Sequence, residues 1–85
     1  MNSIKRKRAI SVENLTKNVT AKHVEEIFEH FGTIEKIIMP MDKHHPNFCT
    51  GSCEIIYKSE KYAVEAERSM HKGQIDGKTI AIKLV

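Results

Sequence analysis

Four residues with metal-binding side chains lie close together near the middle of the chain: His44, His45, Cys49 and Cys53. Imidazole and thiolate groups are common protein ligands of Zn²⁺, so a zinc site is one interpretation of this cluster. The spacing is poor for such a site, because Cys53 falls at a small inward-facing position of an expected strand. A buried cysteine that packs as a small hydrophobe is the favoured interpretation, and we predict no metal and no cofactor.

The residue patterns that identify common enzyme classes do not occur in this sequence. It has no glycine-rich phosphate loop, no nucleophile elbow and no pair of catalytic carboxylates. His23, His30 and His71 lie on or beside expected helices without an obvious nucleophile. The sequence therefore predicts a protein that is not an enzyme.

Positive charge is concentrated in one short run, Lys5-Arg6-Lys7-Arg8. The whole chain has a formal charge of +3, but from Ala9 onward ten basic residues face eleven acidic ones, which leaves −1. Attraction to nucleic acid must therefore come from this run or from local patches. The run suits a nuclear import signal or a nucleic-acid-binding arm, and a solubilising tail is the alternative.

Length and composition indicate one small domain without a membrane segment. The 85 residues suffice for one modest core, and no apolar run approaches the roughly 20 residues that a bilayer span needs. The basic N-terminus lacks the apolar stretch of a signal peptide, so we expect an intracellular protein with reduced cysteines. We divide the chain into a flexible basic arm over 1–8 and a domain over 9–85, and expect a monomer when no partner is bound.

The order of the expected elements is βαββαβ, an α+β split βαβ sandwich of the ferredoxin-like kind. One face of its four-stranded antiparallel sheet lies under two helices, and the other face is open. The first helix has an apolar stripe at helical spacing, Val24, Ile27, Phe28 and Phe31. The elements are a strand over 9–13, a helix capped by Thr20 and ending at Gly32, a strand over 34–39, a loop over 42–50, a strand over 52–57, a helix capped by Ser59 and ending at Met70, a turn at Asp76-Gly77 and a strand over 79–84.

Alternation along the strands sorts their residues between the two faces of the sheet. Ile10, Val12, Cys53, Ile55, Tyr57, Ile80 and Ile82 are expected to point toward the helices. Ser11, Glu13, Ser52, Glu54, Ile56, Ala81 and Lys83 are expected on the open face.

Two segments have the spacing of the strand signatures of an RNA recognition motif, Ile10-Ser11-Val12-Glu13-Asn14-Leu15 and Gly51-Ser52-Cys53-Glu54-Ile55-Ile56-Tyr57. From Ala9 to Val85 the chain resembles this family. The resemblance implies the fold given above and an open sheet face on which aromatic side chains stack on RNA bases. At the stacking positions this chain has Ser11, Ser52 and Glu54 instead.

More narrowly, the chain resembles the family of the RNA-binding protein with a serine-rich domain. The resemblance rests on Leu15-Thr16-Lys17-Asn18-Val19-Thr20, Glu26-Ile27-Phe28, Met39-Pro40, His45-Pro46 and Gly73-Gln74-Ile75-Asp76-Gly77. It implies a nuclear role in pre-mRNA splicing, in the exon-junction complex and in messenger surveillance. It also implies a motif that docks proteins, among them Acinus and a small ubiquitin-fold partner. The serine-rich region of that family is not in this sequence, so its functions are not carried over.

RNA binding on the sheet in the usual way is not expected. Stacking is worth roughly 1–3 kcal/mol per base, so three missing aromatics remove roughly 3–9 kcal/mol. Glu13 and Glu54 also place carboxylates where phosphates or base edges would lie. We therefore expect RNA contact at Ser11, Ser52 and Glu54 to be weak.

Two other surfaces are candidates for binding. A single strand of RNA could be held by the arm (Lys5, Arg6, Lys7 and Arg8) together with Lys43, His44, His45 and Phe48 of the loop. The alternative for the loop is that Phe48 covers the end of the core and the histidines are solvated. The second surface is helical and could dock a basic or amphipathic peptide of a splicing or exon-junction protein, such as an Acinus-like partner. Its residues are Glu25, Glu26 and Glu29 of the first helix and Tyr62 and Arg68 of the second. Tyr62 and Arg68 are expected to be exposed. The alternative for the glutamates is a solvated helix face.

Overall fold

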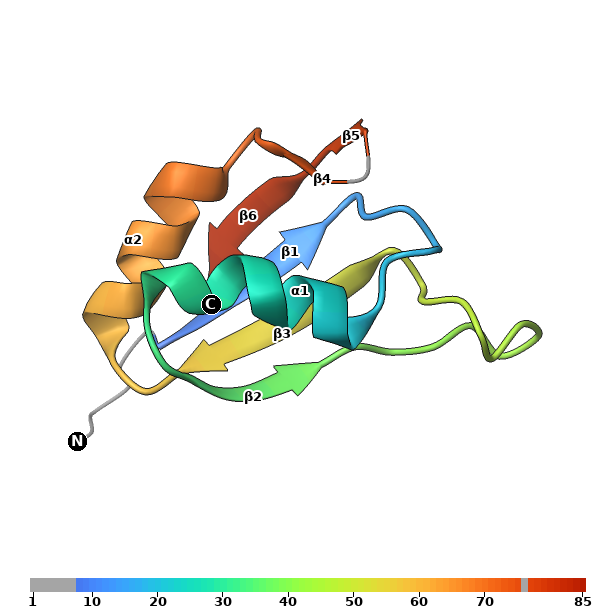
Figure 1. The fold of residues 1–85 in the computed structure, drawn as a ribbon, viewed down its shortest axis with the longest axis horizontal. Coiled ribbons are helices and arrows are strands. Elements are labelled where there is room, and N and C mark those ends of the chain that lie inside the picture. Colours follow the sequence, from blue (N-terminus) through green and yellow to red (C-terminus); the bar gives the residue numbers. More distant parts are fainter. Residues whose placement is uncertain (1–7, 76) are drawn as a thin grey trace.

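The computed structural model describes residues 8–75 and 77–85, which form a four-stranded antiparallel sheet with two α-helices on one face (Figure 1). The strand order is β2-β3-β1-β6, so β1 and β3 are central. This arrangement confirms the predicted βαββαβ sandwich. The elements are β1 (Ala9–Glu13), α1 (Ala21–Phe28), the 3-10 helix η1 (Glu29–Phe31), β2 (Ile34–Ile38), β3 (Ser52–Tyr57), α2 (Glu60–Met70), β4 (Gln74–Ile75), β5 (Lys78–Thr79) and β6 (Ala81–Leu84).

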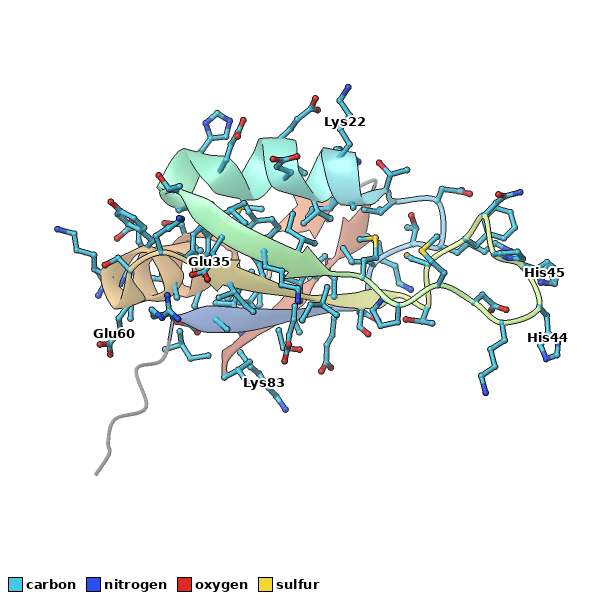
Figure 2. The ribbon with its side chains drawn as sticks, turned by 90° about the horizontal axis from the view of Figure 1, so that it is seen from below. Lys22, Glu35, His44, His45, Glu60 and Lys83 are labelled. Carbon is cyan, nitrogen blue, oxygen red and sulfur yellow. The ribbon has the colours of Figure 1, made fainter. Side chains whose placement is uncertain are left out.

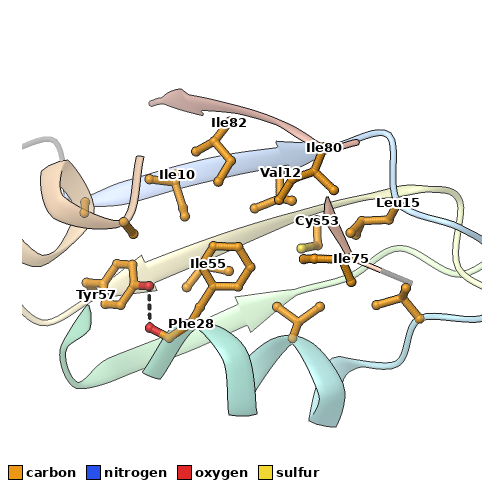
Figure 3. Packing of buried hydrophobic residues seen from close by; sticks show 14 residues of the cluster. Ile10, Val12, Leu15, Phe28, Cys53, Ile55, Tyr57, Ile75, Ile80 and Ile82 are labelled. Atoms are coloured by element: carbon orange, nitrogen blue, oxygen red, sulfur yellow. Dashed lines mark hydrogen bonds between the residues drawn. The ribbon is translucent and has the colours of Figure 1, made fainter. Parts of the chain in front are cut away.

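The core lies between the sheet and the two helices (Figure 3). Every strand residue predicted to face the helices is buried, as the alternation of side chains requires. From the helical side, Val24 and Phe28 of α1 and Ala63 and Ala66 of α2 are fully buried. The small side chains of Ala63 and Ala66 let α2 approach the sheet closely, and the largest fully buried side chains are Tyr57 of β3 and Phe28 of α1.

A bulge in β2 changes which of its residues face the core. The register with β3 shifts between Ile34 and Lys36, so that Glu35 is an extra residue. In a regular strand Ile34 and Ile37 would lie on opposite faces, because side chains alternate. The bulge restores both to the core side, where they pack half-buried against the cluster. Beyond the bulge, Ile38 is 40% exposed.

Helix α1 begins as predicted and ends one turn earlier. The side chain of Thr20 accepts a hydrogen bond from the amide of His23, which is the expected N-cap. The predicted helix runs to Gly32, but α1 ends at Phe28 and the chain tightens into η1, where the Gly32 amide donates to the carbonyl of Glu29. In α2, Ser59 lies at the N-cap position as predicted, but its side chain makes no capping bond.

The single strand predicted over 79–84 is divided in the structure. Lys78 and Thr79 form β5, which pairs with β4 in a short hairpin, and β6 starts only at Ala81. Ile80 lies between them, with its amide donating to the carbonyl of Gly73. The amide of Ile82 on the outer edge of β6 donates to Nδ1 of His71 at 3.0 Å. These bonds satisfy backbone groups at an edge that would otherwise be free. The predicted turn includes Asp76, which lies outside the described residues.

One buried hydrogen bond links the sheet to α1. The hydroxyl of Tyr57 donates to the backbone carbonyl of Phe28 at 2.7 Å, at the point where α1 ends (Figure 3). Burial raises the pKa of the Tyr57 hydroxyl, which therefore stays protonated as the donor. Because the folded state disfavours the phenolate, the hydrogen bond of Tyr57 contributes fully to stability below about pH 10. This contribution is lost as the pH rises further.

Replacement of this donor tests its contribution. We expect Tyr57→Phe to lower the free energy of unfolding by roughly 0.5–1.5 kcal/mol, because a buried hydrogen bond to the carbonyl of Phe28 would be lost. Urea denaturation followed by circular dichroism measures the loss. Tyr62→Phe is the matched control, since in the described structure the Tyr62 hydroxyl has no hydrogen-bond partner. Equal stability of the Tyr57→Phe variant and the unchanged protein would contradict this assignment.

Candidate functional site

The three signature positions lie together on the open face of the sheet. Ser11 of β1 is opposite Glu54 of β3 on one side and Lys83 of β6 on the other, and Ile38 of β2 is opposite Glu54. One row across the face is therefore Ile38, Glu54, Ser11 and Lys83, and Figure 2 shows Lys83 projecting away from α1. The outward orientation predicted for these residues is confirmed. Among the residues that the structure describes, no aromatic side chain stands on this face.

A shallow hollow of about 260 Å³ occupies part of this face. Its lining consists of the aliphatic residues Ile38 and Pro40, the buried Cys53, and the polar residues Ser11, Ser52 and Glu54. Met41, directly after Pro40, is 46% exposed. The hollow thus combines an apolar wall, two hydroxyl groups and one half-buried carboxylate.

The loop between β2 and β3 is ordered by its own hydrogen bonds. The carboxylate of Asp42 accepts from the backbone amides of His44 and His45, at 2.8 and 3.1 Å, and these bonds hold its pKa below the ordinary value. The Asp42 amide donates to the carbonyl of Phe48 at 2.9 Å. His44 and His45 are exposed at the tip (Figure 2). Lys43, which precedes them in the sequence, is also exposed.

Phe48 of this loop contacts a second ring and a cation. The His45 ring stacks on it with centroids 6.0 Å apart and planes 23° apart. The ammonium of Lys17 lies 5.2 Å from the Phe48 centroid, within the range of a cation–π interaction. Phe48 is half-buried and is not among the residues of the core cluster, so it does not cover the end of the core. Lys17 was not among the predicted site residues, because it is 31 positions from Phe48 and no local pattern links the two.

Arg8, predicted to be the last residue of the free arm, is anchored to the sheet. Its guanidinium lies 2.9 Å from the Glu35 carboxylate and also donates to the carbonyl of Tyr57 at 3.4 Å. Glu35 is the extra residue of the bulge in β2, and the ion pair joins it to Arg8 across β3, which lies between β2 and β1. Lys5, Arg6 and Lys7 lie outside the described residues.

Glu25, Glu26 and Glu29 are exposed on α1, as predicted. Two shallow hollows run between α1 and the edge strand β2, and they share Glu25 and Ile34 in their linings. Glu29 and Phe31 line one of them, and Glu35 lines the other. We call this surface the α1–β2 groove. Its lining combines apolar side chains with carboxylates from α1, η1 and β2, and Lys22 and Lys36 line the same hollow as Glu35. Glu26 lines neither hollow.

The prediction that Tyr62 is exposed is wrong. Tyr62 is half-buried, with its ring 6.4 Å from that of Tyr57 in an edge-to-face arrangement. It also lies against Gly32, where an added Cβ would come within 2.1 Å of the Tyr62 ring. The physical reason is that α2 lies close to η1, and the missing side chain of Gly32 leaves room for the ring. Arg68 is exposed on α2, as predicted, and lines neither hollow of the α1–β2 groove.

The cysteines are structural in the described part of the chain. Cys49 and Cys53 are both buried, and the Cys49 thiol donates to the carbonyl of Thr16 at 3.3 Å. Burial, with a smaller effect of nearby Cys49, raises the pKa of the Cys53 thiol to about 12, so it stays protonated and is a poor metal ligand. Within residues 8–75 and 77–85, no three His, Cys, Asp or Glu side chains gather as metal ligands would. Neither α-helix described there has the length and apolar character needed to cross a bilayer.

Comparison with known proteins agrees with this geometry. The curated relatives include RNA-binding protein with serine-rich domain 1 of Danio rerio, 46% identical over 66 residues that make up 78% of this chain and 23% of that protein. The homologue of Schizosaccharomyces pombe is 38% identical over 77 residues, 91% of this chain and 31% of that protein. Nuclear cap-binding protein subunit 2 of Eremothecium gossypii is 36% identical over 75 residues, 88% of this chain and 34% of that protein. The chain thus spans about a quarter to a third of the length of these relatives.

Solved structures share the fold. The RRM of Rna15 with bound RNA superposes with a TM-score of 0.85 at 13% identity, covering 92% of this chain and 82% of that one. The Sxl-lethal protein in complex with RNA superposes with a TM-score of 0.87 at 21% identity, covering 94% of this chain and 48% of that one.

The sequence matches the RNA recognition motif family over residues 10–81, which include β3, both α-helices and all of β1 except Ala9. Members of this family are non-catalytic binding modules, so the prediction that the chain is not an enzyme is confirmed at the level of the family. The predicted resemblance to the RNA-binding protein with a serine-rich domain is also confirmed. This chain therefore belongs to the RNA recognition motif family of RNA-binding domains.

Proposed function

We propose that this chain is a nuclear binding module of pre-mRNA processing that docks splicing or exon-junction proteins and contacts RNA weakly. The names of its relatives, an RNA-binding protein with a serine-rich domain and a nuclear cap-binding subunit, support the setting of RNA processing. The single observation that favours docking is the composition of the open sheet face.

The open face lacks what base stacking requires. Its central row contains an aliphatic side chain, a carboxylate, a hydroxyl group and an ammonium group. Each stacked base would contribute roughly 1–3 kcal/mol, and none of these groups offers a flat π surface. Glu54 lies in the middle of the row and repels phosphate. A face of this kind favours weak RNA contact, with the main binding energy coming from another surface.

The α1–β2 groove is the best candidate for that surface. Its floor includes half-buried Phe31, Ile34 and Ile37, which could receive apolar side chains of a peptide. The match to a basic partner lies in the hollow that Glu25 and Glu29 line, because Lys22 and Lys36 line the other hollow. The partner proposed from the family resemblance is a basic or amphipathic segment of an Acinus-like protein.

A pair of neighbouring glutamates tests docking at the groove. We expect Glu25→Lys to weaken binding of an Acinus-like docking peptide by about tenfold, because Glu25 lines both hollows of the groove. Glu26→Lys makes the same charge change on the next residue, outside the groove, and should have a much smaller effect. Isothermal titration calorimetry at physiological salt measures both. Equal effects of the two substitutions would indicate a long-range charge effect. If neither substitution changed peptide binding, the groove would be excluded as the docking site.

Single-stranded RNA bound by the loop is the second candidate. The observation that favours it is the ordered arrangement of Lys17, His45 and Phe48, a cation and two rings presented near the loop tip. A base could stack on the exposed side of this pair while Lys17 and Lys43 attract phosphate. The basic arm could extend such a contact by charge.

NMR titration with short single-stranded RNAs distinguishes the two candidates. If the loop binds RNA, Phe48→Ala should weaken binding by the roughly 1–3 kcal/mol of one stacked base, and affinity should fall steeply with salt. Met41→Ala is the control, because it removes an exposed side chain of the same loop without removing a ring. Chemical shift changes at Ser11, Ser52 and Glu54 that survive Phe48→Ala would show sheet binding and would contradict both candidates.

Nuclear localisation is proposed from the family resemblance and from the basic run. We expect Lys5, Arg6 and Lys7 changed together to Ala to reduce nuclear accumulation of the chain fused to a fluorescent protein too large for passive diffusion. Arg8 is left unchanged because it is paired with Glu35. Lys58, Lys61 and Lys72 changed together to Ala form the control, since all three are exposed on the domain. Unchanged import of the arm variant, measured by microscopy, would show that the run is not an import signal.

A further inference from the structure

The charge at the centre of the open sheet face has no counterion in the described chain. Among the residues that the structure describes, the ion pairs are Arg8–Glu35 and His45–Asp42. Lys83, in the same row as Glu54, lies two strands away across Ser11, roughly 10 Å by strand spacing. The carboxylate of Glu54 is therefore half-buried on the sheet and open to a cation from outside.

The surroundings of Glu54 suit one kind of cation better than others. Ile38 lies opposite Glu54, and Ile38 and Pro40 form an aliphatic wall of the hollow. A long side chain with a charged end buries its methylene groups against such a wall. Ser11, opposite Glu54, and Ser52, two residues before it, add hydroxyl oxygens at the polar side.

From this arrangement we infer that the hollow formed by Ser11, Ile38, Pro40, Ser52 and Glu54 receives an arginine side chain of a partner polypeptide. A guanidinium has five N–H donors in one plane and can bind a carboxylate through two parallel hydrogen bonds. Its remaining donors would reach the hydroxyl oxygens of Ser11 and Ser52. A lysine ammonium is more strongly hydrated and binds as a point charge, so it fits this half-apolar hollow less well.

The charge of the rest of the face agrees with this occupant. Glu13 is opposite Ser52 in the next row, so a second carboxylate stands on the same face. The lysines of this face lie on the two edge strands, with Lys83 of β6 opposite Ser11 and Lys36 of β2 opposite Ile56, so the charged side chains of the central strands on this face are the two carboxylates. An arginine peptide that crosses the central strands therefore meets the two carboxylates. A phosphate backbone on the same path meets repulsion.

The inference rests on the proposed role as a docking module and adds a second contact surface to it, on the opposite side of the sheet from α1. The α1–β2 groove and the hollow share no lining residue. The two can therefore be tested separately. Failure of the Glu25→Lys test would count against the groove, and failure of the test below would count against the hollow.

An NMR titration with model peptides tests the hollow directly. The probes are an acetylated, amidated Gly-Arg-Gly-Arg-Gly peptide and two matched peptides in which both arginines are lysine or both are citrulline. Citrulline has nearly the shape of arginine without its charge. We expect the arginine peptide to shift the resonances of Ser11, Ile38 and Glu54, the lysine peptide to bind several-fold more weakly, and the citrulline peptide to leave them unchanged at the same concentration.

A charge-matched pair of variants completes the test. We expect Glu54→Gln to weaken binding of the arginine peptide by about tenfold, because a charge-assisted hydrogen-bonded pair is lost. Glu26→Gln changes the net charge equally on the exposed face of α1 and should have little effect. The amide spectra of both variants report that the fold is retained.

Three outcomes would overturn the inference. Equal shifts with the citrulline peptide would show that charge is not recognised, and equal binding by the Glu54→Gln variant would show that this carboxylate is not the receptor. A short cytosine-rich RNA that shifts the same three resonances more strongly than the arginine peptide would assign the hollow to the amino groups of bases, which a carboxylate can also accept.

Discussion

The antiparallel pairing of β1 with β3 determines both faces of the molecule. Ala9 lies opposite Ile56 and Glu13 opposite Ser52, with every intervening residue in register. Because side chains alternate, the same register sends Ile10 toward the helices and Ser11 toward the open face. A slip by one residue would expose the aliphatic set and bury Glu54 in the core. The large free-energy cost of that slip fixes the position of every group on the open face.

The edges of the sheet depend on contacts between distant parts of the chain. At β2, a bulge at Glu35 brings Ile34 and Ile37 to the same side, and Arg8 pairs with Glu35. At β6, the His71 ring accepts a hydrogen bond from the backbone amide of Ile82, which would otherwise be free. These devices satisfy charges and backbone groups at both ends of the strand order, and edge strands in natural proteins are commonly protected in this way.

The three candidate surfaces differ in the kind of partner that their electrostatics favour. The loop presents rings and cations, which suits nucleic acid. The α1–β2 groove and the hollow near Glu54 present carboxylates beside apolar atoms, which suits basic polypeptides. A carboxylate at the middle of the sheet repels phosphate and attracts a cation. In the two proposals above, Glu54 therefore links weak RNA contact to protein docking.

The order of elements, the inward set of aliphatic residues and the composition of the open face could all be predicted from the sequence. These properties follow from local periodicity, which can be recognised within a short segment of sequence. Only the tertiary structure decided the burial of Tyr62 against Gly32, the pairing of Arg8 with Glu35 and the approach of Lys17 to Phe48. It also decided that Ile38 and Pro40 form one hollow with Ser11 and Glu54. Each of these contacts joins residues far apart along the chain or on different strands, so no local pattern contains them.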